Sequence, residues 1–310
     1  MSAAIETQTR ARLEPYPVYG SFIDETIGIV ARQTRDTVSF AVGSPAVEAL
    51  RLVGADELAQ AVIARDGAKA LGYGITEGDP ELRELIAAEA RAAGLQVAAE
   101  QVIVTAGALQ AIDLACRLFI RPGDVAVVES PGFTNALSAL RNHGARVLEV
   151  PADDDGLDVA EAARVLRASG ARAKLFFVVP NFQNPTGATL STARREMLVA
   201  LARHHGAAIV EDDPYRLLRY RGSDQPSLAS LAGDGAVIHV GSFSKTFLPG
   251  IRVGWAIADP ELVRGMAAAK QTTDSSTSSL GQRLVLEFAR RGRFATHLNA
   301  LRAMYAEKQA

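Results

Sequence analysis

Apolar runs alternate with amphipathic segments along the middle of the chain. Many runs are rich in β-branched residues and predict strands at 102–105, 125–129, 146–150, 175–179, 207–211, 237–240 and 254–258. Helical patterns fill most of the segments between them, as at 109–119, 157–169 and 191–204. Because the strands are mostly continuous apolar runs, they are typical of parallel strands that helices cover on both faces. The pattern predicts a three-layer α/β fold with a mostly parallel sheet over about residues 50–270.

The two ends of the chain flank this large domain. Residues 1–49 are rich in turn formers and predict an irregular arm and the start of a small domain, with a helix over about 21–34. After residue 271, small polar residues lead into a helical pattern that continues to residue 310. One apolar stripe of that pattern holds Phe294, Leu298, Leu301 and Tyr305. We expect residues 271–310 to form a linking helix whose apolar stripe stays partly exposed.

Composition narrows the class of protein. The chain has 310 residues, of which 48% are hydrophobic and 22% are charged, and this balance is typical of a globular protein. The formal net charge is −2, and no dense basic run occurs. These features argue against nucleic-acid partners and against binding to an anionic membrane surface. No apolar run is long enough to predict a transmembrane helix.

Cysteine and histidine usage predicts neither a disulfide nor a metal site. Cys116 is the single cysteine, and its apolar neighbours at helical spacing predict a buried structural thiol. The histidines have no metal-ligand spacing, so we expect surface or satisfied core groups at 143, 204, 205, 239 and 297. The first residues are charged and lack the apolar core of a signal peptide. We therefore expect a cytoplasmic protein.

The loop after the strand at 237–240 gathers the strongest candidate chemistry. Lys245 lies among the hydroxyls of Ser242, Ser244 and Thr246, and Arg252 follows shortly after them. A lysine at the end of a buried strand is costly unless it has a partner or a reaction, such as Schiff-base formation with an aldehyde. Hydroxyls and a guanidinium suit a phosphate. An aldehyde and a phosphate on one ligand describe pyridoxal 5'-phosphate; the alternative is a polar loop with a solvated lysine.

Other predicted strands also end in chemically suitable residues. Gly107 opens a helix whose first N–H groups could hold an anion, although an ordinary glycine turn is the alternative. Asn184 precedes Pro-Thr-Gly and could donate to a phenolate oxygen, or could be part of a plain turn. Asp212 could pair with a protonated pyridine nitrogen and Tyr215 with the ring oxygen, or both could belong to a solvated acidic turn. Phe133 could stack on a ring or belong to the core.

Several charged residues have no predicted part in this site. Glu129, the acidic run 153–155 and the pair Arg194-Arg195 are interpreted as solvated or capping residues. By contrast, six features follow one another at successive strand ends: the glycine turn, the aromatic residue, Asn-Pro-Thr-Gly, Asp-x-x-Tyr, Ser-x-Ser-Lys and the arginine. Their joint order is hard to obtain by chance and points to one site for pyridoxal phosphate.

In these motifs the chain resembles the class I/II pyridoxal-phosphate-dependent aminotransferases, which have the aspartate-aminotransferase fold (fold type I). Segments 180–187 and 211–216 are most similar to the branch of 2-aminoadipate aminotransferases and to the catalytic domain of MocR-type regulators. The resemblance implies an enzyme that moves an amino group between an amino acid and a 2-oxo acid. The family roles imply that Lys245 forms the Schiff base and carries the proton, and that Asp212 pairs with the pyridine nitrogen.

The resemblance also implies roles for other residues of the site. Tyr215 and Asn184 would bond the ring oxygen, and Phe133 would stack on the ring. The phosphate would be held by Ser242, Ser244, Arg252 and the N–H groups of Gly107 and Ala108. Gly43 would line the substrate carboxylate together with Asn184. Tyr73 would reach the phosphate of a neighbouring subunit, which implies a homodimer.

The end of the chain departs from the family pattern. Family members continue for roughly another domain, which supplies the arginine for the substrate carboxylate, so we expect the cofactor site to be complete and the substrate site to lack that arginine. Two other functions therefore stay open: a different pyridoxal-phosphate reaction, such as a lyase or decarboxylase, and a cofactor-binding fragment or sensor with impaired catalysis. A MocR-type sensor needs a helix-turn-helix, and we expect none before residue 20.

Overall fold

The computed structural model describes residues 18–20, 25–26, 28–29, 32, 43–233 and 236–310. Within them, one sheet has the strand order β1-β8-β7-β6-β5-β2-β3-β4. Its strands are β1 (Val102–Thr105), β2 (Val125–Ser130), β3 (Arg146–Asp153), β4 (Gly156–Leu157), β5 (Ala173–Val178), β6 (Ala208–Asp212), β7 (Val237–Ser242) and β8 (Gly254–Ile257). Every strand predicted from the pattern is present, and the prediction of a mostly parallel α/β fold is confirmed.

Strand β8 is the exception to the parallel arrangement, because it is antiparallel to both of its neighbours, β7 and β1. Residues 243–253 are all that connect β7 to β8, and a parallel return needs a longer crossover. The apolar run of β8 did not reveal that the strand is antiparallel, because β8 lies buried between two strands, as the parallel strands do. A short antiparallel strand, β4, was not predicted either and pairs with the end of β3.

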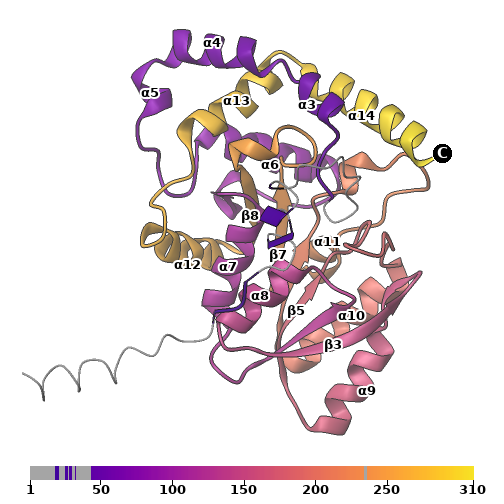
Figure 1. Cartoon of the computed structure of the whole chain (residues 1–310). Helices are drawn as coiled ribbons and strands as arrows, with labels where there is room; N and C mark the ends of the chain where they lie inside the picture. Colours follow the sequence, from indigo (N-terminus) through magenta and orange to yellow (C-terminus); the bar gives the residue numbers. More distant parts are fainter. Residues whose placement is uncertain (1–17, 21–24, 27, 30–31, 33–42, 234–235) are drawn as a thin grey trace, which may run out of the picture.

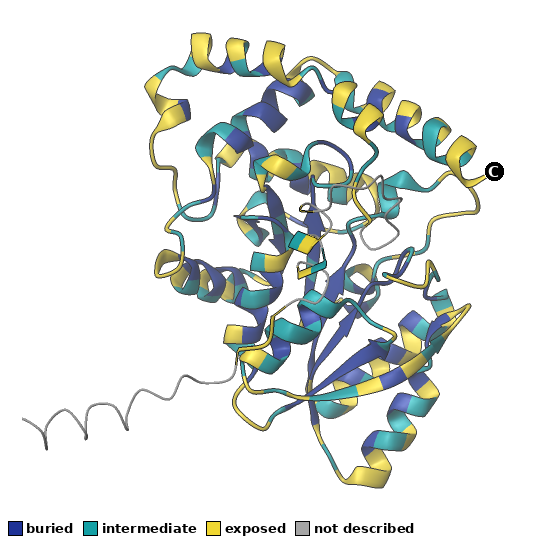
Figure 2. Cartoon of the chain, viewed as in Figure 1, coloured by how far each residue is buried: buried dark blue, intermediate teal, exposed yellow. Residues whose placement is uncertain are grey.

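Helices cover both faces of the sheet, and the strands between them are mostly buried, except β3, in which Val150 alone is buried (Figures 1 and 2). One face packs against α7 (Ala108–Phe119), α8 (Thr134–Asn142) and α12 (Pro260–Gln271). The other face packs against α9 (Val159–Ser169), α10 (Thr192–His205) and α11 (Leu228–Ala232). Cys116 lies in the first of these cores and is buried as predicted. Three short 3-10 helices complete the connections: η1 (Ala99–Gln101), η2 (Arg216–Leu218) and η3 (Pro249–Ile251).

A third core joins segments that are far apart in the sequence. Helices from the two ends of the described chain enclose it: α3 (Val47–Arg51), α4 (Ala55–Asp66), α5 (Ala68–Leu71), α6 (Pro80–Ala92), α13 (Ser279–Arg290) and α14 (Arg293–Gln309). Leu58 and Val62 of α4 are in one cluster with Phe288 of α13, and all three are buried. This core borders β1 and β8 through Val104 and Ile257.

The single helix predicted after residue 271 is wrong, because the segment forms two helices. Gly292 separates α13 from α14 and has a left-handed φ of 65°, which favours glycine. On the predicted apolar stripe, Leu301 is buried and Phe294 packs edge-on against Phe288, with ring centroids 4.9 Å apart. Leu298 and Tyr305 are half-buried, so α14 turns most of this stripe toward the body of the molecule.

The predicted helix boundaries agree with the structure to within one residue at some helices and differ more at one. The helix predicted at 109–119 corresponds to α7, which begins one residue earlier, but the helix predicted from 157 begins at Val159. Leu157 is instead paired in β4, and the Asp158 side chain caps α9 by accepting from the Glu161 N–H at 2.9 Å. The helix predicted over 21–34 lies mostly outside the described residues. The division of the chain at residues 49 and 271 stays a prediction.

We predict that Gly254→Ala destabilises the fold by about 1–3 kcal/mol, the usual cost of overpacking. A Cβ at this position would lie 2.7 Å from the Ala108 nitrogen and 2.9 Å from the Gly107 Cα, both of which are backbone atoms. Gly250→Ala is the matched control, because nothing lies within 4 Å of a Cβ there. Urea unfolding measures both; equal free energies of unfolding for the two variants would contradict this packing.

Candidate active site

The candidate site lies along one edge of the sheet. Strands β1, β2, β5, β6 and β7 run in the same direction, so their carboxyl ends meet there. Ligands of open α/β sheets bind beyond this edge. The loops that leave it begin at residues 106, 131, 179, 213 and 243, and they carry most of the predicted site residues.

Lys245 extends from the loop after β7 into this edge. Its Nζ donates to the Gly43 carbonyl at 2.8 Å and lies 5.9 Å from the centroid of the Tyr215 ring. Burial lowers the pKa of the Lys245 amine, Asp212 opposes this shift, and Arg252 lowers the pKa further. A lowered pKa increases the fraction of neutral amine, which is the form that attacks a carbonyl carbon.

Asp212 ends the central strand β6 and is only 3% exposed. Its Oδ1 is buried and has no hydrogen-bond partner. Burial, followed by the neighbouring Asp213, raises the pKa of Asp212 to about 7, while His239 and Lys245 act in the opposite direction. A buried carboxylate oxygen without a donor is a costly feature that a protonated ring nitrogen would relieve. The residues at this point therefore fit pyridoxal phosphate.

Tyr215 and Asn184 lie near each other. The Asn184 side chain acts to lower the pKa of Tyr215, and the Tyr215 ring packs against the core that contains α7. Burial and the charge of Asp212 raise the pKa of Tyr215 to about 12. Tyr215 is thus a neutral phenol over the physiological pH range and can donate a hydrogen bond to a ring oxygen.

The predicted phosphate residues surround the start of α7. Gly107 has a φ of 86°, and a Cβ on it would lie only 2.3 Å from Arg252 Nη2. Arg252 Nη2 donates to the Ala106 carbonyl at 3.2 Å. The Gly107 N–H donates to the Thr105 carbonyl at 2.8 Å, which leaves Ala108, the first residue of α7, as the better N–H donor to an anion.

The hydroxyls of the same loop form a small network. Ser242 Oγ donates to Ser244 Oγ at 2.9 Å and accepts from the Ser244 N–H at 3.1 Å. Ser242 is buried and Ser244 is half-buried. Both hydroxyl groups can rotate toward an anion, since neither is held by a charged partner among the described contacts.

The remaining predicted residues lie in different surroundings. Phe133 precedes α8 and packs against the core, as in the alternative interpretation. Tyr73 follows α5 and is 96% exposed, so nothing in this chain covers its ring among the described residues. The Gly43 carbonyl accepts from Lys245, which places this glycine beside the amine.

A cavity of about 450 Å³ opens beside Lys245. Its wall is largely aromatic, and it includes Pro45, Phe182, Tyr215, Tyr220, Tyr305 and Lys308. Tyr305 and Lys308 come from the last turns of α14, and the Tyr305 hydroxyl accepts from the Ala46 N–H at 3.3 Å. The end of α14 and the segment after Gly43 therefore meet at the mouth of this cavity.

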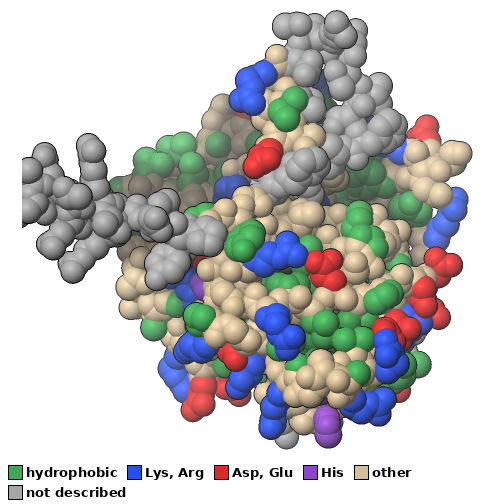
Figure 3. All heavy atoms as spheres, turned by 60° about the horizontal axis from the view of Figure 1, so that its bottom comes forward, with side chains coloured by type: hydrophobic (Ala, Val, Ile, Leu, Met, Phe, Trp, Pro, Cys, Tyr) green, Lys and Arg blue, Asp and Glu red, His purple; other side chains and the backbone are tan. Residues whose placement is uncertain are grey.

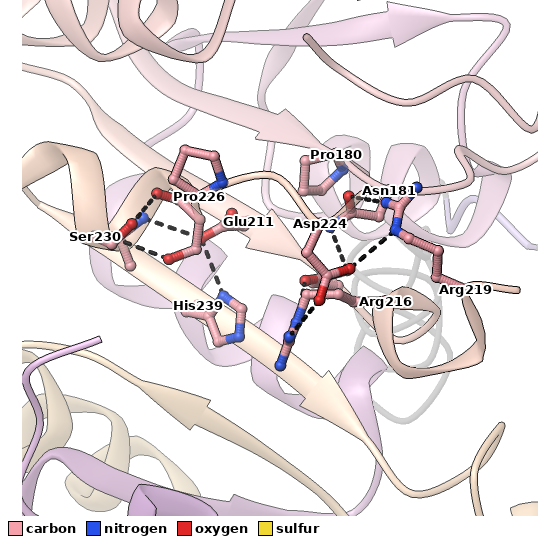
Figure 4. Close-up of polar contacts among 12 residues, drawn as sticks. Pro180, Asn181, Glu211, Arg216, Arg219, Asp224, Pro226, Ser230 and His239 are labelled. Carbon is pink, nitrogen blue, oxygen red and sulfur yellow. Dashed lines mark hydrogen bonds and ion pairs between the residues drawn. The ribbon is translucent and has the colours of Figure 1, made fainter. Parts of the chain in front are cut away.

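A buried polar layer supports the strand that ends at Asp212 (Figure 4). Glu211 accepts from the Leu228 N–H at 2.7 Å and lies 3.0 Å from His239 Nδ1. Burial acts against ionisation of both groups, but their mutual attraction raises the pKa of His239 and lowers that of Glu211. Asp213 accepts from Asn181 Nδ2 at 2.9 Å. The two sequence neighbours of Asp212 are thus tied to other elements, whereas Asp212 Oδ1 has no donor among the described residues.

Two residues interpreted from the sequence as solvated or capping are buried, so that prediction was wrong. Arg195 is 0% exposed, and its Nη2 donates to the Pro180 carbonyl at 2.8 Å and to Asn181 Oδ1 at 3.0 Å. Its spacing of three and seven residues from Leu198 and Ala202, which are buried on α10, was the signal that could have revealed it. Glu129 is 2% exposed and lies at the same edge of the sheet as Asp212.

The described residues contain no helix long and apolar enough to cross a membrane. In that part of the chain, no group of three or more His, Cys, Asp or Glu side chains could hold a metal ion. Basic, acidic and apolar side chains are interspersed over the visible face in Figure 3, which is turned from the view of Figure 1. That face therefore presents no extended field of one charge.

Comparisons with known proteins agree with this geometry. The sequence model of the family "Aminotransferase class I and II" matches residues 35–309. The chain belongs to this family. It is a pyridoxal-phosphate-dependent aminotransferase, and pyridoxal phosphate is its cofactor.

Individual relatives fall in the predicted branch. The chain is 37% identical to the 2-aminoadipate transaminase of Thermus thermophilus over 274 residues, which are 87% of this chain and 67% of that protein. It is 35% identical to the probable rhizopine catabolism regulatory protein MocR of Rhizobium meliloti, over 77% of this chain and 47% of the relative. It superimposes on the kynurenine aminotransferase of Pyrococcus horikoshii, solved with PMP, with a TM-score of 0.85 and 34% identity; the match covers 94% of this chain and 72% of the other.

We predict that Asp212→Asn changes the pH dependence of stability of the cofactor-free protein. The folded pKa of Asp212 is about 7, above the ordinary 3.8, so stability present at low pH is lost as the pH rises toward 7. Asparagine cannot ionise, so the difference in Tm, variant minus parent, should increase between pH 5 and pH 8.

Glu287→Gln is the control for this measurement. Hydrogen bonds from Arg291 and Arg65 lower the pKa of Glu287, so it stays ionised throughout that pH range. Its difference in Tm from the parent should be constant above pH 5. A constant difference for Asp212→Asn as well would show that Asp212 is already ionised in the cofactor-free fold.

Proposed function

We propose that this aminotransferase carries out its reaction at the edge formed by β1, β6 and β7, with Lys245 as the covalent attachment point of the cofactor. The observation that carries the proposal is the pairing of an amine of lowered pKa, Lys245, with a buried carboxylate oxygen that lacks a donor, on Asp212. Bound pyridoxal phosphate supplies an electron sink for the substrate carbon next to the amino group.

Each residue of this edge then has a task that its surroundings support. Asp212 pairs with the ring nitrogen and keeps it protonated, since the buried carboxylate has no competing donor on Oδ1. Tyr215 and Asn184 hold the ring oxygen, and Phe133 covers one ring face. Once displaced from the cofactor, the Lys245 amine is the base that removes a proton from the substrate carbon and returns it.

The phosphate contacts are proposed to come from Arg252, Ser242, Ser244 and the N–H groups at Gly107-Ala108, with Ala108 as the stronger backbone donor. Arg252 already lies against Gly107, where no side chain could fit between them. A fixed guanidinium and a helix start together provide charge-assisted and backbone hydrogen bonds to a dianion.

We further propose that the protein works as a cytoplasmic homodimer. Support comes from Tyr73, whose ring is 96% exposed and therefore free to enter a neighbouring subunit's site. The substrate is proposed to bind near Gly43 and Asn184, in the cavity beside Lys245. The chain is proposed to divide into an arm with part of a small domain (1–49), a large domain (50–270) and a connecting segment (271–310).

The attachment point can be tested directly. We expect borohydride reduction of the protein with pyridoxal phosphate to fix the label on Lys245, because its amine is the one that burial and the site geometry direct to the cofactor aldehyde. Peptide mass mapping reads the position. Lys270, a buried lysine that donates to Asp274, is the internal control and should stay unlabelled. A label on any other lysine would exclude Lys245 from this role.

Arg252→Ala should weaken pyridoxal phosphate binding by roughly 2 kcal/mol, because a charge-assisted contact to phosphate is lost. Arg252→Lys should recover only part of this affinity, since lysine lacks the planar fork. Equilibrium dialysis against pyridoxal phosphate, with pyridoxal as the ligand without phosphate, measures the effect. Affinity for pyridoxal should be almost unchanged; if both ligands weaken equally, Arg252 acts on the fold and not on the phosphate.

A further inference from the structure

Glu129 is a second buried carboxyl group at the same edge, and the reaction outlined above does not use it. It lies one residue before the end of β2 and is 2% exposed. Its Oε2 accepts from the Val179 N–H at 2.9 Å and from Gln183 Nε2 at 3.4 Å. Its Oε1 is buried and has no partner, like Oδ1 of Asp212. A buried acid with an oxygen in this state needs an explanation.

The contacts of Glu129 hold a loop that carries a proposed cofactor contact. Gln183, which is 2% exposed, donates to the Pro131 carbonyl at 2.8 Å. Its side-chain oxygen accepts from the Thr186 N–H at 2.9 Å and from the Thr186 hydroxyl at 2.7 Å. Asn184, which lies near Tyr215, is inside this closed loop. The Glu129 carboxyl group therefore sets the position of the backbone from which Asn184 extends.

Glu129 also contacts the loop that follows β2 and carries Phe133. Gly132 approaches the Glu129 backbone so closely that a Cβ there would lie 2.4 Å from the Glu129 carbonyl oxygen. Phe133 follows this tight turn and directly precedes α8. Glu129 thus joins the loop of Phe133 to the loop of Asn184, through its backbone on one side and its carboxyl group on the other.

Burial and neighbouring charge decide whether Glu129 is protonated or ionised at this edge of the sheet. Burial raises the pKa of Glu129 to about 7, and the Asp212 carboxylate adds to this shift, while the bonds from Val179 and Gln183 oppose it. Among the described residues, Asp212 is the charged group that shifts the pKa of Glu129; the contacts from the 179–187 loop are a backbone N–H and an amide. Two carboxylates in one dry region disfavour each other's ionisation, so a single negative charge is the favoured state.

We propose that Glu129 is a positioning residue that stays protonated when Asp212 is ionised, and that its neutral carboxyl group fixes the loop carrying Asn184 through Val179 and Gln183. The inference rests on the proposed function in one respect, the assignment of Asn184 and Tyr215 to the cofactor. A neutral Glu129 does not compete with Asp212 for a cation, so the protonated ring nitrogen of the cofactor can pair with the Asp212 carboxylate. An ionised Glu129 would instead compete with Asp212 for that cation.

The first experiment measures the proton on the full chain without added cofactor. Glu129→Gln is isosteric and always neutral, so its difference in Tm from the parent should increase as the pH rises from 5 to 8, because the parent loses stability when Glu129 is forced to ionise. In an Asp212→Asn background this increase should be smaller and should end at lower pH, since the neighbouring charge that raises the pKa of Glu129 has gone. Glu287→Gln should again give a constant difference.

The second experiment measures positioning on the full chain with pyridoxal phosphate. Glu129→Gln keeps the acceptor for Val179 and Gln183, so its dissociation constant should stay within about twofold of the parent value. Glu129→Ala leaves the buried Val179 N–H without its partner and removes one of the two acceptors of Gln183 Nε2, so binding should weaken about tenfold. Adding Asn184→Ala to Glu129→Ala should weaken binding little further, because both changes remove the same contact.

Each outcome decides a separate point. If the Tm difference between Glu129→Gln and the parent does not change with pH, Glu129 is ionised. If Glu129→Gln loses as much affinity for pyridoxal phosphate as Glu129→Ala does, the charge of Glu129 is required. Either result overturns the proposal. Full additivity of Glu129→Ala with Asn184→Ala would show that Glu129 does not act through that loop. If Glu129→Ala does not fold, Glu129→Gln alone still decides the first experiment, and its affinity relative to the parent still shows whether the charge of Glu129 is required. The pH experiment uses no cofactor, so it stands even if Lys245 proves not to be the attachment point.

Discussion

The candidate site depends on the exclusion of water from the end of strand β6. This strand lies in the centre of the sheet, with β7 on one side and β5 on the other, and helices cover both faces. Asp212, its last residue, is therefore held in a dry environment with one oxygen that has no donor. In water the carboxyl group would be an ordinary acid. Here its ionised form is costly without a cation, and the site is suited to a ligand that brings one.

A ring of polar contacts keeps this costly group in place. The sequence neighbours of Asp212, Glu211 and Asp213, are satisfied by His239, by backbone N–H groups and by Asn181. Arg195 reaches the same layer from α10 and holds the start of the 180–187 loop. These bonds fix the backbone on either side of Asp212 but leave its Oδ1 free. The fold thus stabilises the position of the carboxylate without neutralising its charge.

The helices from the two ends of the described chain contribute to the same region. Their common core packs against β1 and β8, next to the loops of Gly107 and Lys245. The last turns of α14 meet the segment after Gly43 at the mouth of the cavity beside Lys245. Segments separated by more than two hundred residues therefore line one cavity. This cavity is the place where we propose that an amino acid meets the cofactor.

The sequence by itself determined the type of fold and most of the chemistry of the site. Continuous apolar runs showed buried strands, and functional residues at their ends could be placed at one edge, because parallel strands end together. The sequence did not show the direction of β8, which depends on a short connection, or the break at Gly292 between α13 and α14. It also misplaced Glu129 and Arg195 among solvated residues. Only the tertiary structure decided these points, because the burial of a charged side chain depends on partners from distant segments, and local patterns do not record those partners.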